Sequence, residues 1–355
     1  MKRRTLLAAG ASLAAIGATS AWFARQRTAR TLLDSFSPRA ESGKMQYREF
    51  GKTGLSVSEV GFGAWGIGGK AYGRVEHSAA LDALARAEEL GCNFVDTALV
   101  YGDSERVLGE FLRGRRDRWI VSTKFSGQSD GMTATLEKQL ELLGTEAVDF
   151  YQLHWVPRGK DEVLYEELAK LKRAGKARFI GVSLYTAEDI DFVLGRPELD
   201  GFQVAFNLLE PDPFMARLAD IRASGRAVIV RSALREGFLT GKFRRDAKFP
   251  DPDDQRHGWT AEDIARTVDQ VEQFRFLEAK AGSMVAAAGR YPLSFAAVST
   301  VVLGTKSAKQ ADSNFGAVPG GRFTGDELAR IRDTQVALSL GSAWRRALRR
   351  FGLAP

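Results

Sequence analysis

The chain has 355 residues, of which 44% are hydrophobic and 27% charged, a composition typical of a soluble globular protein. Its one cysteine, Cys92, excludes an internal disulfide and a cysteine-based metal cluster. The net charge of +7 belongs to the two ends, because residues 1–44 carry +6 and residues 341–355 carry +4, which leaves residues 45–340 slightly acidic. This distribution argues against a basic nucleic-acid-binding face and against nucleic acid as a partner.

Residues 1–21 predict a bacterial export signal. The paired arginines Arg3 and Arg4 precede a weakly hydrophobic stretch rich in Ala, Gly and Ser, which ends in the small residues Thr19 and Ala21. This layout is typical of the twin-arginine pathway, which exports folded proteins, so we expect cleavage after Ala21, the twin-arginine export machinery as a partner, and a periplasmic location. The alternatives are an inner-membrane anchor facing the periplasm, with membrane contact through this segment, and a short cytoplasmic helix.

Residues 22–44 have no periodic pattern and predict a polar, basic linker before a domain at 45–340. In that domain, short β-rich runs alternate with amphipathic helical stretches such as 78–91, 104–114 and 133–144, each of which ends in Gly. The runs that predict strands are 58–65, 92–99, 119–125, 148–155, 177–185, 201–207, 227–234 and 298–305.

Eight strands alternating with helices within about 250 residues predict an α/β fold of the closed (β/α)8 TIM barrel type. An open doubly wound sheet is the rival, but no GxGxxG turn follows the first strand. After the seventh strand comes a long, charged connection at 235–259, and loops of this length in a compact domain are usually functional. A helical stretch near 261–289, a final helix over 324–338 and a basic C-terminal tail at 341–355 complete the chain.

Four polar residues stand at or just after the ends of the second, third and fourth strands: Asp96, Tyr101, Lys124 and His154. In such barrels the catalytic groups stand at the carboxyl ends of the strands. A Lys or a His inside an apolar run needs a partner, because burying either one alone is costly. Each residue alone has a structural explanation, as a cap, an ion-pair member or a satisfied core histidine. Together, on three consecutive strands, they favour a catalytic site.

The four residues resemble the active-site set of the aldo-keto reductases, which carry an Asp, a Tyr five residues later, a Lys after the third strand and a His after the fourth. The resemblance covers roughly residues 45–320 and includes the segments YREFGKTGLSVSEVGFGAW, DFYQLHW, GKARFIGVS, FLTGK and GTKS. It implies a nicotinamide-dependent oxidoreductase that reduces aldehydes or ketones, or oxidises alcohols or sugars, by hydride transfer. The partner is then a small-molecule carbonyl or alcohol.

Carbonyl reduction builds negative charge on oxygen, so a proton donor must stand beside that oxygen. We expect Tyr101 to be the general acid in reduction and, as tyrosinate, the base in oxidation. An ordinary phenol has a pKa near 10, and we expect the ammonium of Lys124 to lower it. Asp96 is expected to keep Lys124 charged and in place. Neutral His154 is expected to orient the carbonyl and donate a hydrogen bond.

The resemblance also implies the cofactor residues. Ser183 and Gln203 match the clamp on the nicotinamide amide, although Leu184 stands where the family commonly has Asn. Phe206 matches an aromatic ring that stacks on the nicotinamide, with a filler of the barrel as the alternative. The segment RSALREGFLTGKF resembles the strap that binds the pyrophosphate, and it offers four residues: Ser232, Leu234, Gly237 and Lys242.

After the eighth strand, GTKSAKQADSN supplies five further cofactor residues: Gly304, Lys306, Ser307, Gln310 and Asn314. Amides and hydroxyls at a helix start suit a phosphate, and Lys306 suits the extra 2′-phosphate of NADP. We therefore expect NADP(H) as the cofactor, with NAD(H) second, although Gln310 stands where an Arg is frequent. Trp65 and Tyr72 are expected to wall the substrate pocket, with ordinary loop packing as the alternative. No metal is expected, because the three histidines have no metal-ligand spacing.

Two other functions stay open at this point. Some relatives of the aldo-keto reductases hold cofactor as redox-sensing or regulatory subunits and turn over slowly, and the basic tail then suits a partner or a membrane surface. A non-redox barrel enzyme, an isomerase or aldolase with Lys124 as nucleophile, is the second rival. The sequence leaves the natural substrate, the reaction direction and the oligomeric state undetermined.

Overall fold

The computed structural model describes residues 45–69 and 72–340. The predicted export signal at 1–21, the linker at 22–44 and the basic tail at 341–355 lie outside the described residues. Within the described ranges, no helix is both long enough and apolar enough to cross a membrane.

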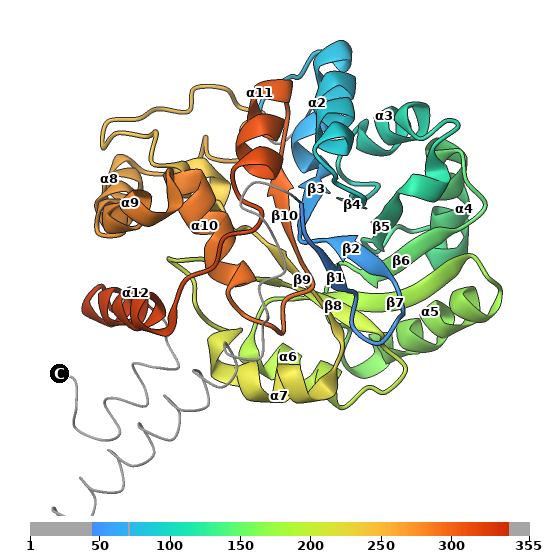
Figure 1. Cartoon of the computed structure of the whole chain (residues 1–355). Coiled ribbons are helices and arrows are strands. Elements are labelled where there is room, and N and C mark those ends of the chain that lie inside the picture. The colour runs from blue at the N-terminus through green and yellow to red at the C-terminus, as the bar shows by residue number, and fades with distance from the viewer. Residues whose placement is uncertain (1–44, 70–71, 341–355) are drawn as a thin grey trace, which may run out of the picture.

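Eight parallel strands close into a barrel, in the order β10-β3-β4-β5-β6-β7-β8-β9 (Figure 1). The strands are β3 Val60–Gly63, β4 Phe94–Asp96, β5 Ile120–Phe125, β6 Val148–Leu153, β7 Ala177–Leu184, β8 Gly201–Ala205, β9 Ala227–Arg231 and β10 Thr300–Gly304. Neighbouring strands follow one another along the chain, and β10 closes the ring by pairing with both β9 and β3. The predicted (β/α)8 TIM barrel is confirmed.

Helices surround the barrel on its outer side (Figure 1). They are α2 His77–Glu89, α3 Ser104–Phe111, α4 Gly131–Leu143, α5 Val163–Arg173, α6 Ala187–Leu194, α7 Leu218–Ser224, α8 Ala261–Glu272, α9 Glu278–Ala281, α10 Met284–Leu293, α11 Ala308–Ala311 and α12 Gly325–Ala337. In α4, for example, the buried Leu136, Leu140 and Leu143 recur at helical spacing, and Gly144 ends the helix in the left-handed conformation.

A short antiparallel hairpin precedes the barrel, and the sequence analysis did not predict it. Strands β1 Tyr47–Glu49 and β2 Ser56–Ser58 pair with each other. Phe50, in the turn between them, is fully buried, with its ring centroid 5.2 Å from that of Phe150 and 5.6 Å from that of Phe94. Because Phe94 and Phe150 point into the barrel from β4 and β6, the hairpin closes the amino-terminal end of the barrel and leaves the carboxyl end for the site.

The strands are shorter than the apolar runs that predicted them. The run 92–99 contains only β4 Phe94–Asp96, and the run 227–234 contains β9 Ala227–Arg231. The residues beyond each strand are still mostly apolar, but they lie in the loops at the carboxyl end of the barrel. The helical stretch near 261–289 is likewise broken into α8, α9 and α10, with Gly282 in the left-handed conformation before Ser283 caps α10.

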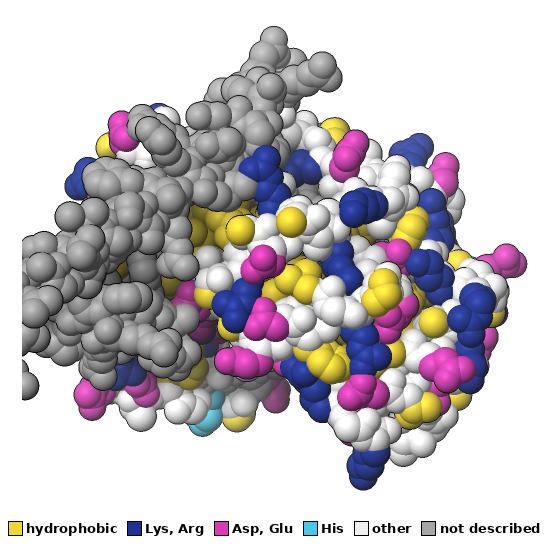
Figure 2. All heavy atoms as spheres, turned by 90° about the horizontal axis from the view of Figure 1, so that it is seen from below, with side chains coloured by type: hydrophobic (Ala, Val, Ile, Leu, Met, Phe, Trp, Pro, Cys, Tyr) yellow, Lys and Arg dark blue, Asp and Glu magenta, His cyan; other side chains and the backbone are white. Residues whose placement is uncertain are grey.

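On the face shown in Figure 2, Lys and Arg side chains of the described residues alternate with Asp and Glu side chains. Many charged side chains of the described residues form ion pairs, such as Arg217 with Asp191 and Arg158 with Asp189. A mixed surface of this kind has no large field of one sign. The face in view therefore agrees with the near-neutral charge counted for residues 45–340.

Candidate active site

The structure brings the four predicted catalytic residues together at the carboxyl end of the barrel. Asp96 is the last residue of β4, Lys124 lies in β5, and His154 directly follows β6. Tyr101 lies in the turn between β4 and α3, where its backbone N–H donates to the carbonyl of Ala98. Because the strands are parallel neighbours, their carboxyl ends meet on one side of the barrel.

Lys124 is the centre of this group. Its side chain is fully buried, and its Nζ lies 2.6 Å from Asp96 Oδ2, 2.8 Å from the carbonyl oxygen of Thr97 and 3.4 Å from Tyr101 Oη. An ammonium has three donors, and these three acceptors use them all. The lysine is therefore fixed between a carboxylate and the tyrosine oxygen.

The pKa of Tyr101 differs from the one expected from the sequence, whereas Lys124 is charged as expected. Burial on its own lowers the pKa of the Lys124 ammonium, but Asp96 and Tyr101 outweigh it, so the pKa is raised and the lysine stays charged. Burial raises the pKa of the Tyr101 phenol by more than the positive charge of Lys124 lowers it. The expected pull of Lys124 on Tyr101 is present, yet the net shift is upward because the phenol is desolvated. Tyr101 is thus protonated at neutral pH.

Two buried side chains that the sequence analysis missed hold Asp96. Ser122 Oγ donates to Asp96 Oδ1 at 3.0 Å, and Gln152 Nε2 lies 3.3 Å from the same oxygen and 2.8 Å from Ser122 Oγ. Both residues point into the barrel two positions before Lys124 and His154 on the same strands. One oxygen of Asp96 is therefore tied to the barrel and the other is free to bind Lys124.

His154 lies beside Tyr101, with the two ring centroids 5.8 Å apart and the rings nearly perpendicular. Burial, together with the charge of Lys124, lowers the pKa of His154 to about 4, so the imidazole is neutral at neutral pH, the form expected from the sequence. Its Nδ1 lies 2.8 Å from Ser126 Oγ, and its backbone carbonyl accepts from the Tyr185 hydroxyl at 3.2 Å. These contacts fix both the ring and the backbone of His154.

Ser183 and Gln203 are register partners on β7 and β8. Both side chains are buried, and neither Ser183 Oγ nor Gln203 Nε2 has a hydrogen-bond partner among the described residues. Leaving a buried polar atom unpaired costs about 1–3 kcal/mol, so two such atoms side by side mark a place for a ligand. A hydroxyl beside an amide N–H fits the carboxamide of a nicotinamide, which offers both a donor and an acceptor.

Phe206 lies in a different environment from the one expected. It follows β8 and is fully buried in an aromatic cluster, with its ring centroid 4.3 Å from that of Phe214, 5.0 Å from that of Tyr291 and 5.3 Å from that of Phe295. Phe206 thus packs on α10 and on the loop after β8. This placement matches the alternative of a packing residue and gives no support to a stacking role.

The segment after β9 has an unusual backbone. Ser232, Arg235 and Glu236 have positive φ angles of 57°, 45° and 48°, and Gly237 has 88°. Non-glycine residues adopt this conformation rarely, and it clusters at functional sites. The carbonyl of Leu234 accepts from the backbone N–H groups of Gly237 and Leu239 and keeps the turn tight. Ser232, Leu234 and Gly237 thus lie together in the tight turn that follows β9.

Three cations lie near one another beyond the strap: Lys242, Lys306 and Arg256, the last of which the sequence analysis missed. Burial and the charge of Arg256 lower the pKa of both lysines, and each lysine feels its neighbours' charge. Arg256 is held by the carboxylate of Asp254, with 2.8 Å between Arg256 Nε and Asp254 Oδ1. Like charges crowded in this way are relieved by an anion, and phosphate is the anion that Lys and Arg bind most readily.

The residues after β10 form a compact turn around Lys306. Gln310 Oε1 accepts from the Lys306 backbone N–H at 2.9 Å, and Ser307 caps α11 by accepting from the Gln310 N–H. Asn314 Nδ2 donates to Thr305 Oγ1 at 2.8 Å and lies 3.3 Å from the carbonyl oxygen of Gly304. Gln310 and Asn314 therefore shape the turn from within.

Asp96, Tyr101, Lys124 and His154 are called the tetrad from here on. Trp65 and Tyr72 lie at the same end of the barrel as the tetrad. The Trp65 ring centroid is 5.9 Å from that of Tyr101 and 5.7 Å from that of Tyr72, and 37% of Trp65 is exposed. Tyr72 also pairs with Asp254 through an isolated bridge, and its carbonyl accepts from Lys306 Nζ at 2.8 Å. The loop after β3 and the long connection after β9 therefore meet beside the tetrad, and Trp65 lies between that junction and Tyr101.

Arg231, the last residue of β9, is a further charged residue at this end of the barrel that the sequence analysis passed over. Its charge lowers the pKa of both Tyr101 and His154, although burial is the larger influence on each. Its Nη2 donates to the carbonyl of Leu184 at 3.1 Å. The signal was available, because Arg231 is a charged residue inside the apolar run AVIVRSAL, the same criterion that singled out Lys124.

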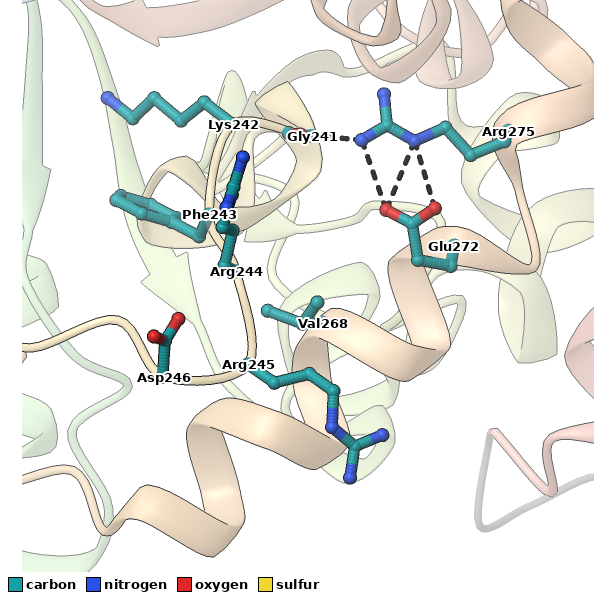
Figure 3. Close-up of a pocket in the computed structure, with 9 residues that line it drawn as sticks. All are labelled: Gly241, Lys242, Phe243, Arg244, Arg245, Asp246, Val268, Glu272 and Arg275. Carbon is teal, nitrogen blue, oxygen red and sulfur yellow. Dashed lines mark hydrogen bonds and ion pairs between the residues drawn. The ribbon is translucent and has the colours of Figure 1, made fainter.

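A cavity of about 480 Å³ lies between the strap and α8, on the outer side of the barrel. Its lining consists of residues 241–246, Val268, Glu272 and Arg275. Figure 3 shows Arg275 bonded to Glu272 and to the Gly241 backbone, while Lys242 and Phe243 point away from that pair. None of the tetrad residues lines this cavity, so it is separate from the candidate active site.

Among the described residues, no group of three or more His, Cys, Asp or Glu side chains is placed to hold a metal ion.

Comparison with known proteins agrees with this geometry. The model of the aldo/keto reductase family matches residues 59–335. The chain is 29% identical to the aldo-keto reductase str7 of Strobilurus tenacellus, over 78% of this chain and 88% of the relative. It is 28% identical to the NADH-specific methylglyoxal reductase of Escherichia coli, over 65% of this chain and 80% of the relative.

Among solved structures, the glycerol dehydrogenase AKR11B4 from Gluconobacter oxydans superimposes with a TM-score of 0.71 at 27% identity. The match covers 83% of this chain and 96% of that one. The fold, the arrangement of the tetrad and the family match lead to the same assignment. The chain belongs to the aldo/keto reductase family and is an NAD(P)H-dependent oxidoreductase.

Proposed function

We propose that this enzyme reduces small aldehydes or ketones with NADPH, and oxidises the corresponding alcohols in reverse, with Tyr101 as the acid and base. The observation that carries the proposal is Lys124 Nζ, held by Asp96 at 2.6 Å and reaching Tyr101 Oη at 3.4 Å. A protonated phenol fixed beside a buried cation is suited to give a proton to an oxygen that is gaining negative charge.

When bound, the nicotinamide supplies or accepts the hydride. Tyr101 Oη transfers its proton to the substrate oxygen, and the phenolate that forms is stabilised by the positive charge of Lys124. Asp96 keeps that charge in place. His154 is neutral and, with Nδ1 engaged by Ser126, has its other ring nitrogen left to hydrogen-bond the substrate oxygen.

The cofactor residues divide into two groups. Ser183 and Gln203 would hold the nicotinamide amide, since their buried polar atoms have no partner among the described residues. Lys242, Arg256 and Lys306 would hold the phosphates, together with the strap residues Ser232, Leu234 and Gly237. We propose NADP(H) over NAD(H) on the strength of the three cations. One relative is NADH-specific by name, so this preference rests on the residues of this chain alone.

The substrate is a small carbonyl compound or alcohol. Relatives named for methylglyoxal and for glycerol support small oxygenated molecules as the class to test first. Tyr72, Trp65 and Tyr185 supply aromatic rings around the tetrad for such a substrate to pack on. A hydrophobic wall with a few polar groups is the usual composition of a small-molecule site.

We also propose export to the periplasm by the twin-arginine pathway, which rests on Arg3, Arg4 and the residues that follow them. Replacing both arginines by lysine should leave the protein in the cytoplasm, as measured by cell fractionation with antibody detection. A periplasmic or membrane-bound double variant would contradict twin-arginine export. Membrane-bound wild-type protein would favour the anchored alternative.

Steady-state NADPH oxidation by the purified full chain, with a panel of aldehydes, ketones and sugars, tests the proposed reaction. We expect turnover by the wild-type protein and a loss of at least about a thousandfold in Tyr101→Phe, since that variant removes the acid while keeping the ring. NADPH affinity should be unchanged in the variant. Comparable turnover by Tyr101→Phe would exclude the assigned role of Tyr101. Tight NADPH binding without turnover on any compound would favour a cofactor-holding regulatory subunit.

A further inference from the structure

Arg231 occupies a position at the carboxyl end of the barrel that the proposed reaction does not yet use. It is the last residue of β9 and pairs in register with Ala205 of β8. Ile229 and Ala227, two and four positions earlier, belong to the apolar cluster inside the barrel. Because side chains alternate along a strand, Arg231 also points to the inside, on the layer where the tetrad lies.

The guanidinium has few contacts for a half-buried cation. Nη2 donates to the carbonyl of Leu184 at 3.1 Å, and the guanidinium carbon lies 4.7 Å from the centroid of the Tyr185 ring. Nε is buried and has no hydrogen-bond partner among the residues at 45–69 and 72–340. Arg231 forms none of the ion pairs found within those ranges. Guanidinium groups stay charged in proteins, so this charge is not neutralised by a described side chain.

The neighbouring acids do not supply the missing partner. Asp96 is already engaged by Lys124, Ser122 and Gln152. Glu236 feels the charge of Arg231, but burial raises the pKa of its carboxyl, and its ion pair at 3.6 Å is with Arg235. Lys124 and Arg231 are therefore two cations near Asp96, whose carboxylate is already engaged.

Arg231 also lies close to the reacting groups. Its charge acts on the Tyr101 phenol and on the His154 imidazole, while the ring under its guanidinium, Tyr185, donates a hydrogen bond to the His154 carbonyl. Tyr185 is 55% exposed, which leaves the Arg231 side of the site open to solvent. A molecule whose carbonyl oxygen meets Tyr101 thus has a cation within reach of its other end.

We infer that Arg231 binds a carboxylate of the substrate, so that the preferred substrates are carbonyl compounds that also carry a carboxylate, a class that includes oxo acids and aldehyde acids. A carboxylate accepts two parallel N–H bonds from a guanidinium, and the unpartnered Nε with a neighbouring Nη presents that pair. Bound there, the carboxylate neutralises the excess positive charge beside Lys124. The inference rests on the proposed carbonyl reduction and specifies its substrate class.

Matched substrates with and without a carboxylate test the inference on the wild-type holoenzyme. We expect kcat/KM for 4-oxobutanoate to exceed that for butanal by at least roughly tenfold, the worth of a charge-assisted hydrogen bond. Succinate, which has no carbonyl to reduce, should compete with 4-oxobutanoate and bind the NADPH-loaded enzyme in a calorimetric titration, whereas 1,4-butanediol should not. Equal kcat/KM for the two aldehydes, or no binding of succinate, would overturn the inference.

The variants Arg231→Leu and Arg231→Lys test whether the preference for 4-oxobutanoate over butanal depends on Arg231, and Arg118→Leu is the control. Arg118 is an exposed arginine before β5, at the opposite end of the barrel. In Arg231→Leu, the ratio of kcat/KM for 4-oxobutanoate to kcat/KM for butanal should fall about tenfold to a hundredfold and succinate binding should disappear, whereas Arg118→Leu should change neither. Arg231→Lys should keep part of the preference, because it keeps the charge and loses the bidentate geometry.

Two outcomes separate this inference from the proposed reaction. Butanal turnover with no preference for the acid would keep carbonyl reduction and reject the role of Arg231. Succinate binding that depends on Arg231, without turnover of either aldehyde, would keep the carboxylate site and reject carbonyl reduction. An equal loss of NADPH affinity and of 4-oxobutanoate turnover in Arg231→Leu, with both aldehydes affected alike, would assign Arg231 to the cofactor and overturn the inference.

Discussion

Ser183 and Gln203 face each other across the β7–β8 pair, and each buries a polar atom that has no partner among the described residues. On the neighbouring strands β5 and β6, by contrast, Ser122 Oγ and Gln152 Nε2 both bond to Asp96. The donors that hold Asp96 therefore have their acceptor among the described residues, whereas Ser183 Oγ and Gln203 Nε2 are left for a ligand.

Gln203→Leu should weaken NADPH binding about fivefold to a hundredfold, because it removes one donor to the nicotinamide amide and leaves the ligand's carbonyl unpaired. The dissociation constant can be measured from NADPH fluorescence. Gln335→Leu is the matched control, since Gln335 is also buried but donates to the carbonyl of Leu208, away from the site. Equal affinity in Gln203→Leu and the wild type would show that the unpaired amide does not serve the cofactor.

The pH dependence should differ between the two directions of the reaction. Reduction needs the phenol of Tyr101, and burial raises its pKa above the ordinary value of 10.0. We therefore expect kcat/KM for reduction to stay level from neutral pH to about 10 and to fall beyond. Oxidation needs the phenolate, so its kcat/KM should rise with pH across the same range.

On the acid side, reduction should weaken only near pH 4, where His154 gains its proton. Steady-state rates from pH 4 to 11, in buffers of constant ionic strength, measure both limbs. A fall in reduction between pH 6 and 8 would contradict the assignment of Tyr101 as a phenol with a raised pKa.

Asp96 and Lys124 should be coupled in stability as well as in catalysis. Asp96→Asn leaves a fully buried ammonium without its carboxylate, and breaking a buried pair in this way costs about 3–5 kcal/mol. The double variant Asp96→Asn with Lys124→Met should be more stable than Asp96→Asn alone, because the unpaired charge is gone. Urea denaturation of the wild type, Asp96→Asn, Lys124→Met and the double variant gives the four free energies of unfolding. If the losses in the two single variants add up to the loss in the double variant, the coupling is contradicted.

Most of the fold could be predicted from the sequence because strand and helix periods alternate through the whole domain. The ends of the strands could not, since the apolar run continues past β4 and past β9 into loops that are themselves buried, with Ala98 and Ala233 as examples. The β1–β2 hairpin was missed for a related reason. Its strands have three residues each, too few to show a period of two.

The tetrad could be predicted because each member is a polar residue at the end of an apolar run. Its supporting residues could not, since their partners are distant in the sequence, as with Gln152 and Asp96, which are 56 positions apart. Arg256 lies in an irregular loop and pairs with Asp254, so only the folded chain brings it to Lys306. Sequence patterns show which residues lie on a strand, but they do not show which loop contacts that strand in the folded protein.

Phe206→Ala should destabilise the protein without a selective effect on the cofactor. The residue is fully buried and stacks on Phe214, so its removal should cost about 3–5 kcal/mol in the free energy of unfolding. Phe214→Ala is the matched control and should behave alike. Where Phe206→Ala folds too poorly to assay, Phe206→Leu gives the same comparison. A loss of NADPH affinity in the Phe206 variants alone would instead support the stacking role predicted from the sequence.

Lys306→Ala should shift the cofactor preference from NADP toward NAD. Burial, and after it the charge of Arg256, lowers the pKa of Lys306, and the charge of Lys306 in turn lowers that of Lys242. A phosphate bound among these three cations would reduce their mutual repulsion. We expect the dissociation constant for NADPH to rise about tenfold to a hundredfold and that for NADH to change less than about twofold. Higher salt should weaken NADPH binding to the wild type more than to the variant.

Lys309→Ala is the control for that shift, because Lys309 is an exposed lysine three residues further on, in α11. It should leave both dissociation constants unchanged. Equal affinity of the wild type for NADPH and NADH would remove the basis for an NADP preference. A parallel loss of both cofactors in Lys306→Ala would place Lys306 on the shared pyrophosphate, because only the 2′-phosphate distinguishes the two molecules. A selective loss of NADPH is the result that assigns Lys306 to that phosphate.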